Sequence, residues 1–277
     1  MFSILIPSWN NLAFLKLCVE SIQLYASVET QIIIHVNDGS DGTLDWVKQN
    51  AFEFTHTPKN EGVCVAVNLA SKLANYDYIV FMNDDMFVLP GWDKTLLDEI
   101  RLLKTDCFMV SATMIEPLAT GNKCVIVGDY GSGVANFNLQ KLLIDFEFMV
   151  KNDWSGATWP PSVVHRKWWN KVGGYSEEFS PGMSSDDDFA MKMWAAGCRD
   201  FKGVGKSRVY HFISKSTGRV VRNDGRKQFF NKWHMKQSTF HKYYLRRGEA
   251  YHGSLKEPAS SIGLYANKVL AYFEKWI

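Results

Sequence analysis

The sequence predicts an α/β fold in which parallel strands are joined by crossover helices. In the N-terminal part of the chain, short apolar runs of strand length alternate with stretches whose apolar residues recur at helical spacing. Each apolar run ends in polar and turn-forming residues, as strands do where they enter a loop. The chain has 277 residues, 46% hydrophobic and 22% charged, which is typical of a folded protein with a sizeable core.

The N-terminal strands and helices are expected to alternate. The apolar runs predict strands at residues 2–6, 31–36, 52–56 and 78–82. Helical spacing follows Asn10 and Asn60, and either asparagine can cap the helix that it precedes. The predicted order is strand, helix, strand, helix, strand, helix, strand.

The rest of the chain is less regular. Strands are expected at residues 104–112, 122–127, 162–165 and 207–210, and a helix at 139–150. A second helix is expected to run from Asp186 to Ala196 and to end at Gly197. The apolar residues of 262–277 are expected to dock on the body of the protein, with a second subunit or a membrane as alternatives.

Charge is distributed unevenly along the chain. The formal net charge is +2, but residues 215–247 hold ten Lys and Arg against one acid, Asp224, and so carry +9. The rest of the chain carries −7. The basic segment could close over a phosphate-bearing ligand, approach an anionic membrane or solvate a helix. Nucleic acid is the less favoured partner, because the acidic body would repel it.

The cysteines and the N-terminus indicate a reducing compartment. The five cysteines lie far apart, without a pair at the spacing of a zinc or redox site, and are expected to be reduced thiols. The chain enters an apolar run directly, with no basic region before it, and no apolar run approaches ~20 residues. We therefore expect a cytoplasmic protein, with peripheral membrane contact through the basic segment as an alternative.

Polar residues gather where the predicted parallel strands end, and this edge of such sheets binds ligands. Asn83, Asp84 and Asp85 follow the fourth strand and offer oxygen ligands for Mg²⁺ or Mn²⁺. Asp85 is the first choice for the metal, with Asn83 or Asp84 contributing directly or through water. The alternative is an ordinary acidic turn.

Two further acidic segments are candidates for chemistry. Asp38 and Asp41, set among Gly39 and Gly42, could accept hydrogen bonds from a nucleoside, although the same residue types form ordinary turns. Residues 186–188 are three consecutive aspartates at a predicted helix start. One could act as a general base, or all three could be a capping cluster.

His211 follows the last predicted strand, and its imidazole could complete a metal site. A single histidine in such a position is usually structural, so this role depends on its surroundings.

Taken together, these motifs resemble glycosyltransferase family 2 in kind and in order. The resemblance covers about residues 1–215. It is carried by the following segments: Pro7-Ser8-Trp9-Asn10, Asn37-Asp38-Gly39-Ser40-Asp41-Gly42-Thr43, Asn60-Glu61-Gly62, Asn83-Asp84-Asp85, and Gly173-Gly174-Tyr175 through Phe189. The chain departs from the family pattern at Asn83, where Asp is usual, and at Ser185, where Glu is usual.

The resemblance implies a GT-A fold: a Rossmann-like mixed sheet flanked by helices, here followed by a mainly helical, basic extension. It also implies a division into a catalytic domain of residues 1–214 and an aromatic-rich extension of residues 215–277. Within the domain, residues 1–103 would bind the nucleotide sugar and residues 104–214 the acceptor.

The resemblance implies inverting transfer of a hexosyl or deoxyhexosyl group from a nucleotide-diphosphate sugar to a hydroxyl of a glycan, lipid-linked sugar or protein-linked sugar. Asp186 would be the catalytic base, with Asp187 as its rival, and Mn²⁺ or Mg²⁺ would be held by Asp85 and His211. Acceptor binding is assigned to Trp154 and Asp188. The tryptophans of the middle segment, Trp154, Trp159, Trp168 and Trp169, offer flat apolar faces for sugar rings, although core packing is the more common role of such residues, and Trp154 is the first choice. The donor-binding set is Pro7, Asn10, Asp38, Asp41, Asn60, Gly62, Asn83 and Asp84.

Two other functions remain as alternatives. A catalytically degenerate carbohydrate- or nucleotide-binding module would explain Asn83 and Ser185. A sugar-phosphate nucleotidyltransferase would need a glycine-rich basic loop after the first strand, where this chain has Pro7 to Asn10. The donor sugar, the nucleotide base, the acceptor, the linkage and the oligomeric state are not fixed by any motif.

Overall fold

The computed structural model describes residues 1–213, 219–260 and 264. The predicted apolar residues of 262–277 lie, apart from Leu264, outside the described residues. The strands are β1 (Phe2–Trp9), β2 (Thr30–Asn37), β3 (Glu53–Thr57), β4 (Tyr78–Phe81), β5 (Met86–Val88), β6 (Phe108–Glu116), β7 (Ile126–Val127), β8 (Trp154–Ser155), β9 (Ser162–His165) and β10 (Asp200–His211).

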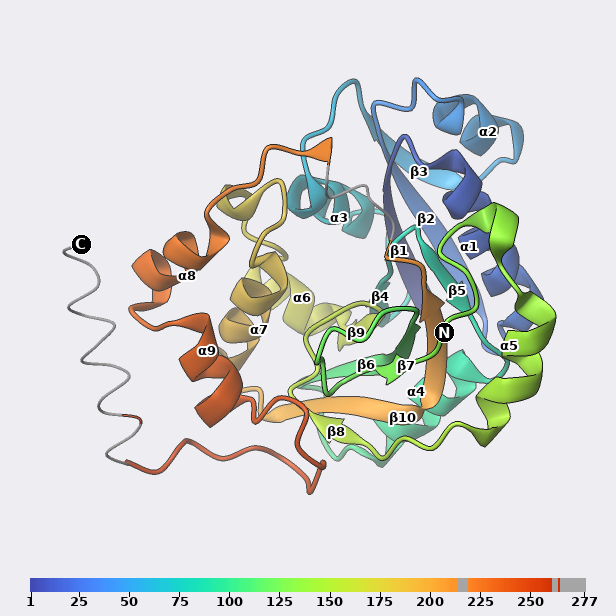
Figure 1. Ribbon diagram of the computed structural model, residues 1–277. Coiled ribbons are helices and arrows are strands. Elements are labelled where there is room, and N and C mark those ends of the chain that lie inside the picture. Colours follow the sequence, from blue (N-terminus) through green and yellow to red (C-terminus); the bar gives the residue numbers. More distant parts are fainter. Residues whose placement is uncertain (214–218, 261–263, 265–277) are drawn as a thin grey trace.

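The helices connect and flank these strands (Figure 1). They are α1 (Leu12–Tyr25), α2 (Thr43–Gln49), α3 (Val63–Ser71), α4 (Trp92–Leu102), α5 (Leu139–Asp145), α6 (Arg166–Val172), α7 (Ser185–Ala195), α8 (Gly225–Trp233) and the single turn α9 (Gln237–Thr239). Short 3-10 turns form at Val134–Asn136, Phe146–Phe148 and Glu177–Phe179, and a π-turn, η5, at Phe240–Tyr244. None of the helices in the described residues is long and apolar enough to span a membrane.

One mixed sheet organises the fold. Its strand order is β3-β2-β1-β4-β9-β6-β10-β5, with β7 beside β6 and β8 beside β10. Strands β3, β2, β1 and β4 are parallel, which confirms the strand and crossover pattern predicted for the N-terminal part. Strand β9 then runs antiparallel to both β4 and β6, and β5 runs antiparallel to β10. The predicted mixed, helix-flanked sheet is thus confirmed.

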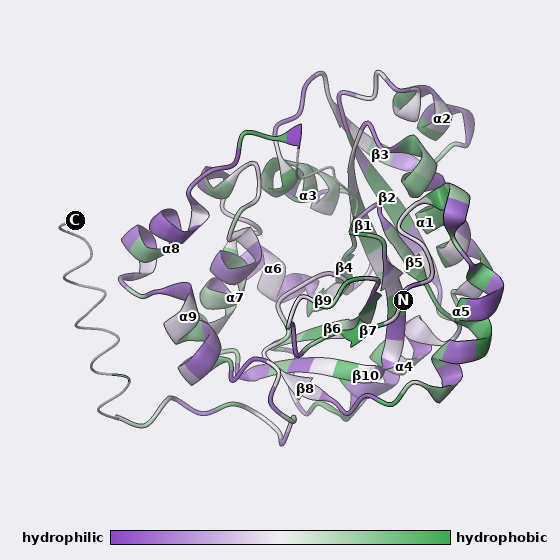
Figure 2. Cartoon of the chain, in the orientation of Figure 1, coloured by the Kyte–Doolittle hydropathy of each residue, from purple (hydrophilic) through white to green (hydrophobic). Residues whose placement is uncertain are grey.

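Two hydrophobic clusters cover the two faces of the sheet. Helices α3, α6 and α7 pack on one face, and α1 and α4 on the other (Figure 1). Figure 2 shows hydrophobic residues along the central strands and hydrophilic stretches on outer elements such as α8. Burial of apolar side chains on both faces, at about 25 cal/mol for each Å², is what holds these layers together.

Several predicted elements have different bounds in the structure, among them the strands expected at 104–112 and 122–127, which are β6 and the two-residue β7. The helix expected at residues 139–150 ends as an α-helix at Asp145 and continues only as a 3-10 turn. The strand expected at 207–210 is the end of the much longer β10. Gly203 within β10 lies against Trp154, where an added Cβ would come within 1.8 Å of the indole ring, so the strand needs glycine there.

The basic C-terminal segment is part of the body of the protein. Phe229, Phe240, Tyr244, Leu245 and Leu255 are buried in the same cluster as residues of α3 and α7. Its aromatic residues therefore contribute to a shared core, because hydrophobic contact continues across the boundary that the sequence suggested at residue 214.

Candidate functional site

A cleft of about 780 Å³ opens where the parallel strands end at their carboxyl termini. The ends of β1 and β2 and the segments after β3 and β4 line one part of it, and the segment leading into α7 together with the end of β10 lines another. Eight residues proposed from the sequence line it: Pro7, Asn60, Gly62, Asn83, Asp84, Asp85, Asp186 and His211. The structure thus brings the predicted metal ligands and the predicted base to one cleft.

The acidic pair that follows β4 is buried at the floor of the cleft. Ser8 Oγ donates to Asp84 Oδ2 at 2.7 Å, and Asn11 Nδ2 donates to Asp84 Oδ1 at 3.1 Å. Burial, and then the neighbouring Asp85 carboxylate, raise the pKa of Asp84 to about 7. Asp84 is therefore held by the end of β1 and by the residue that precedes α1.

His211 ends β10 beside Asp85. Its Nε2 lies 3.5 Å from Asp85 Oδ1, and its Nδ1 lies 2.9 Å from Glu116 Oε1. Burial lowers the pKa of His211, but the carboxylates of Asp85 and Glu116 outweigh it and raise that pKa to about 10. The carboxylate of Glu116 orients the imidazole so that Nε2 faces Asp85.

This donor set fits a divalent cation that is completed by a ligand. Among the described residues, no group of three or more His, Cys, Asp or Glu side chains is arranged to hold a metal alone. Mg²⁺ and Mn²⁺ commonly take one or two protein ligands and fill the remaining positions with phosphate oxygens and water. Asp85 and His211 would supply those two ligands, with Glu116 bonded behind the histidine as such ligands usually are.

Glu116 was not foreseen from the sequence. The predicted strand stopped at residue 112, whereas β6 continues to Glu116 because Thr113, Met114 and Ile115 pair with β10. The sequence signal that could have found it is the mostly apolar run of residues 108–115, which ends in the acid Glu116.

Asp186 begins the first turn of α7 and faces the cleft. The hydroxyl of Tyr175 donates to its Oδ1 at 2.9 Å. Tyr175 is itself fixed, because its ring stacks on Phe189 with 4.8 Å between centroids. Burial is the main cause that raises the pKa of Asp186 to about 7, and the hydrogen bond from Tyr175 opposes it. A carboxyl group with this pKa is suited to general-base chemistry near neutral pH.

Asp187, the rival for the role of base, points to the C-terminal segment. Arg247 Nη2 lies 2.5 Å from Asp187 Oδ1, and His241 Nε2 lies 2.8 Å from the same oxygen. Gln237 donates to Oδ2 at 2.7 Å. Despite burial, the charge of Arg247 and the hydrogen bond from His241 lower the pKa of Asp187. It does not line the cleft, so the geometry favours Asp186 over Asp187.

Asp188, which the sequence assigned to the acceptor, is fully buried and lies outside the cleft lining. It accepts hydrogen bonds from Ser176 Oγ at 2.5 Å and Trp233 Nε1 at 2.8 Å, and pairs with Lys232 at 3.0 Å. Asp188 thus links α7 to α8. The structure does not place its side chain where it could contact an acceptor in the cleft.

Replacing Asp188 by Ala is expected to destabilise the fold. Removing one partner of a buried charged network costs about 3 kcal/mol, which lowers Tm by roughly 10 °C in a protein of this size. Thermal unfolding should show this loss, whereas Asp45→Ala, at an exposed acid in the first turn of α2, should change Tm little. Equal Tm values for the two variants would refute a structural role for Asp188.

The two aspartates of the turn after β2 accept hydrogen bonds from nearby protein groups. Asn10 Nδ2 donates to Asp38 Oδ2 at 2.9 Å, and Asp41 accepts from the backbone nitrogens of Leu12 and Thr43. Asn10, Asp38 and Asp41 do not line the cleft, but Asn37 at the end of β2 does. Asp41 is therefore engaged in capping α1 and α2, and Asn37 is a lining residue that the sequence did not single out.

Gly62 joins two walls of the cleft. Its φ is +85°, and a Cβ at this position would lie 2.7 Å from the Cα of Pro181. The backbone nitrogen of Val63 donates to Pro181 O at 3.1 Å. The Asn60-Glu61-Gly62 motif therefore requires glycine for close contact with the loop that precedes α7.

The tryptophans of the middle segment differ in their surroundings. Trp154, the predicted acceptor contact, is 4% exposed, donates from Nε1 to Thr113 Oγ1 at 3.0 Å and does not line the cleft. Trp159 is partly exposed and does line it. Trp154 is thus a core residue, and Trp159 is the tryptophan of the middle segment that lines the cleft.

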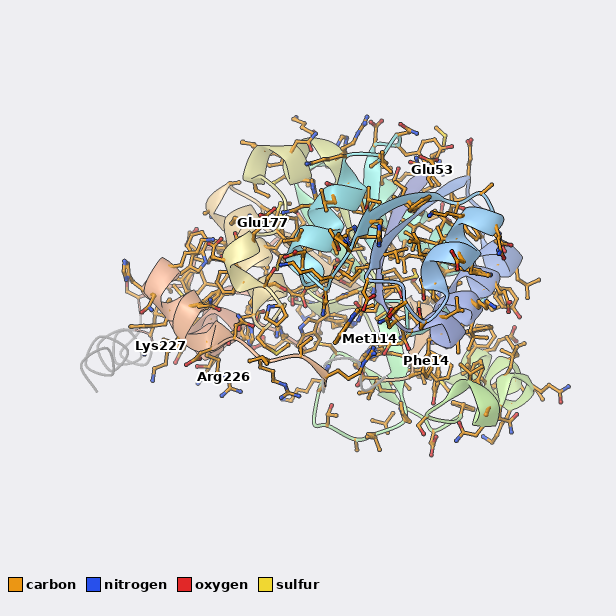
Figure 3. The ribbon with its side chains drawn as sticks, turned by 90° about the horizontal axis from the view of Figure 1, so that it is seen from above. Phe14, Glu53, Met114, Glu177, Arg226 and Lys227 are labelled. Atoms are coloured by element: carbon orange, nitrogen blue, oxygen red, sulfur yellow. The ribbon has the colours of Figure 1, made fainter. Side chains whose placement is uncertain are left out.

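The basic side chains of the C-terminal segment fall into two groups. Lys232 and Arg247 pair with Asp188 and Asp187, and Arg219 donates to the backbone oxygen of Trp9. Arg226 and Lys227 on α8 lie at the outer edge of the molecule, away from Met114 at its centre (Figure 3). Part of the +9 charge is therefore used within the protein, next to α7.

Comparison with known proteins agrees with this arrangement. Residues 3–123 match the family described as Glycosyl transferase family 2. No curated protein matches the chain. Among solved structures, S. aureus TarS residues 1–349 in complex with UDP is similar with 15% identity and a TM-score of 0.55, over 77% of this chain and 61% of that one.

GalNAc-T7 with UDP, GalNAc and Mn²⁺ is similar with 14% identity and a TM-score of 0.57, over 81% of this chain and 44% of that one. The TarS structure with UDP-GlcNAc has a TM-score of 0.55 at 15% identity, over 76% of this chain and 57% of that one. This chain therefore spans between 44% and 61% of the length of these solved chains. The chain thus shares the GT-A fold of these structures, and its residues 3–123 match the model of glycosyl transferase family 2.

Proposed function

We propose that the protein is an inverting glycosyltransferase that moves a sugar from a nucleotide-diphosphate sugar to a hydroxyl group of an acceptor. The observation that supports this most is the presence, in one cleft, of the neighbouring Asp85 and His211 and of Asp186, a carboxyl group with a raised pKa. The solved neighbours whose titles name UDP or UDP-GlcNAc make UDP-sugars the first donors to test.

Each residue has a defined task in this proposal. Asp85 and His211 would hold Mn²⁺ or Mg²⁺, which when bound stabilises the negative charge of the departing nucleoside diphosphate. Asp186 would take the proton of the acceptor hydroxyl as its oxygen attacks the anomeric carbon from the side opposite the leaving group. Tyr175 holds Asp186 in the orientation that this transfer requires.

Donor binding is assigned to the loops that follow the parallel strands. Pro7, Asn60, Gly62, Asn83 and Asp84 line the cleft and are proposed to surround the nucleotide sugar. Peripheral membrane contact stays a prediction for exposed basic residues of α8 such as Arg226 and Lys227.

Thermal shifts with nucleotides would test the donor site. A nucleoside diphosphate at 100 times its Kd should stabilise the protein by ~2.7 kcal/mol, which is several degrees in Tm. We expect this shift for one of the diphosphates UDP, GDP and dTDP, with Mn²⁺ present and not with a chelator, and CMP serves as the monophosphate in the panel. No shift with any of them would contradict the proposed donor site. A shift without transfer to any hydroxyl acceptor would instead favour a binding module.

A further inference from the structure

We propose that Trp159, supported by Arg247, is the platform on which a neutral sugar ring of the acceptor stacks. This inference rests on the proposed glycosyl transfer and adds the acceptor subsite and its chemical class. The proposal follows from four features of the cleft: which indole rings reach it, how Trp159 is held, how close it lies to α7, and which charges surround it.

Trp9 and Trp159 are the tryptophans of the described chain that line the cleft. Trp9 ends β1 on the donor side, and the guanidinium carbon of Arg219 lies 4.4 Å from its ring centroid. Trp168, in contrast, lies on α6 outside the cleft and donates to Asp106. Trp159 is therefore the lining tryptophan that does not belong to the donor side of the cleft.

The ring of Trp159 is held rigidly. The guanidinium carbon of Arg247 lies 4.4 Å from the ring centroid. Arg247 Nη2 donates to Thr158 Oγ1 at 2.6 Å, and Ser111 Oγ donates to the backbone oxygen of Trp159 at 2.9 Å. A preorganised aromatic surface loses little conformational entropy on binding, which suits it to contact the apolar face of a pyranose.

The same arginine connects the ring to the catalytic helix. Arg247 Nη2 lies 2.5 Å from Asp187 Oδ1, so a single side chain spans from the residue next to Asp186 to the indole of Trp159. A sugar stacked on this ring would carry its hydroxyl groups beside the start of α7. Placement of that kind is what converts a bound acceptor into a reactive one.

The charges of the cleft favour a neutral acceptor. Its lining acids are Asp84, Asp85, Glu116 and Asp186, and His211 is the basic side chain among the described lining residues. The remaining neighbours on the acceptor side include Met114, Pro160 and Met183, which are apolar. An anionic sugar would be repelled by Asp186 in its catalytic, ionised form, whereas a neutral ring would not.

Saturation-transfer NMR can test this subsite directly. The probes are methyl glycosides of glucose, galactose, N-acetylglucosamine and rhamnose, with methyl glucuronide as the anionic comparison and 1-octanol as a simple apolar ligand. With UDP and Mn²⁺ bound, we expect wild-type protein to transfer saturation to at least one neutral glycoside, and less to the glucuronide. Trp159→Ala should weaken that binding about tenfold, and Trp159→Phe should restore most of it.

Matched variants separate the subsite from general damage. Trp168→Ala removes an indole outside the cleft and should leave glycoside binding unchanged. Arg247→Lys keeps a cation near Asp187 but loses the planar guanidinium, so it should weaken glycoside binding less than Trp159→Ala does. The UDP-induced thermal shift, which tests the donor site, should be the same in Trp159→Ala and wild type.

The outcomes distinguish the two proposals. Loss of glycoside binding in Trp159→Ala with an unchanged UDP shift supports the acceptor subsite. Equal glycoside binding in Trp159→Ala and wild type, stronger binding of the glucuronide or of 1-octanol, or no binding of any neutral glycoside would overturn it. Absence of a UDP shift in wild type would instead count against the donor site. The comparison of glycoside binding between Trp159→Ala and wild type would still support or overturn the acceptor subsite.

Discussion

Replacing Asp186 by Asn should lower kcat by about 10²- to 10⁴-fold, because general-base assistance of this size is lost when the carboxylate becomes an amide. The amide is nearly isosteric and can still accept the hydrogen bond from Tyr175, so the cleft should keep its shape. Initial rates of transfer from the accepted UDP-sugar measure the loss. The UDP-induced thermal shift should remain, since Asp186 is not one of the two proposed cation ligands.

The pH dependence gives the same assignment a second readout. The base must be ionised to accept a proton, and burial raises the pKa of Asp186 to about 7. Wild-type kcat/KM should therefore fall below about pH 7 and level off above it, whereas the residual rate of Asp186→Asn should not follow that profile. The charged groups that face Asp186 are Asp187 and Arg247, and Tyr175 donates to it.

Asp187→Asn and Asp45→Asn serve as comparisons for this experiment. Asp187 pairs with Arg247 and His241, and its removal should affect stability more than the chemical step. Asp45 is exposed on α2 and should be neutral in both assays. An Asp186→Asn enzyme with near wild-type turnover, or a larger loss of kcat in Asp187→Asn, would show that the base has been misassigned.

The parallel half of the sheet could be predicted because its signals are local. Apolar runs that end in polar clusters mark β1 to β4, and this order places Pro7, Asn83 and Asp85 at one edge without any knowledge of distant contacts. His211 was also placed correctly at the end of a strand, although most of β10 was missed.

The missed features depend on long-range contacts. β10 contains Gly203 and Gly205, which are unusual in strands and are required here because Trp154 and the backbone of Lys151 approach them. The same contact buries Trp154, so its role could not be read from the sequence. Glu116 likewise depends on the pairing that extends β6 along β10.

The three aspartates of α7 show where a motif stops being informative. Successive helical residues point about 100° apart, so Asp186, Asp187 and Asp188 must face three directions. Which of them faces the cleft depends on the C-terminal segment, whose Arg247 and Lys232 hold Asp187 and Asp188. The basic extension, which the sequence alone left open to a ligand, a membrane or solvent, therefore contributes contacts that orient the start of α7.

Replacing Asp85 by Ala should abolish the Mn²⁺-dependent part of the UDP thermal shift and lower kcat/KM by about a thousandfold or more, because charge stabilisation by the cation supplies several kcal/mol. Asp85 lies 3.5 Å from His211 and is buried at the cleft floor, so its loss removes one of the two proposed ligands. Titration of Mn²⁺ in the presence of UDP, followed by Tm and by rate, measures both effects.

Glu116→Gln provides a graded comparison for the same site. Glu116 lies 2.9 Å from His211 Nδ1, the ring nitrogen that does not face Asp85, so its loss should weaken Mn²⁺ binding by about 10- to 100-fold, less than the loss of a ligand. Excess Mn²⁺ should rescue Glu116→Gln, because the ligands remain, but should not rescue Asp85→Ala. If Asp85→Ala kept a full Mn²⁺-dependent shift, the cation would have to bind elsewhere. If both variants were equally impaired at saturating Mn²⁺, Glu116 would itself act as a ligand, and the proposed role of His211 as the second ligand would be wrong.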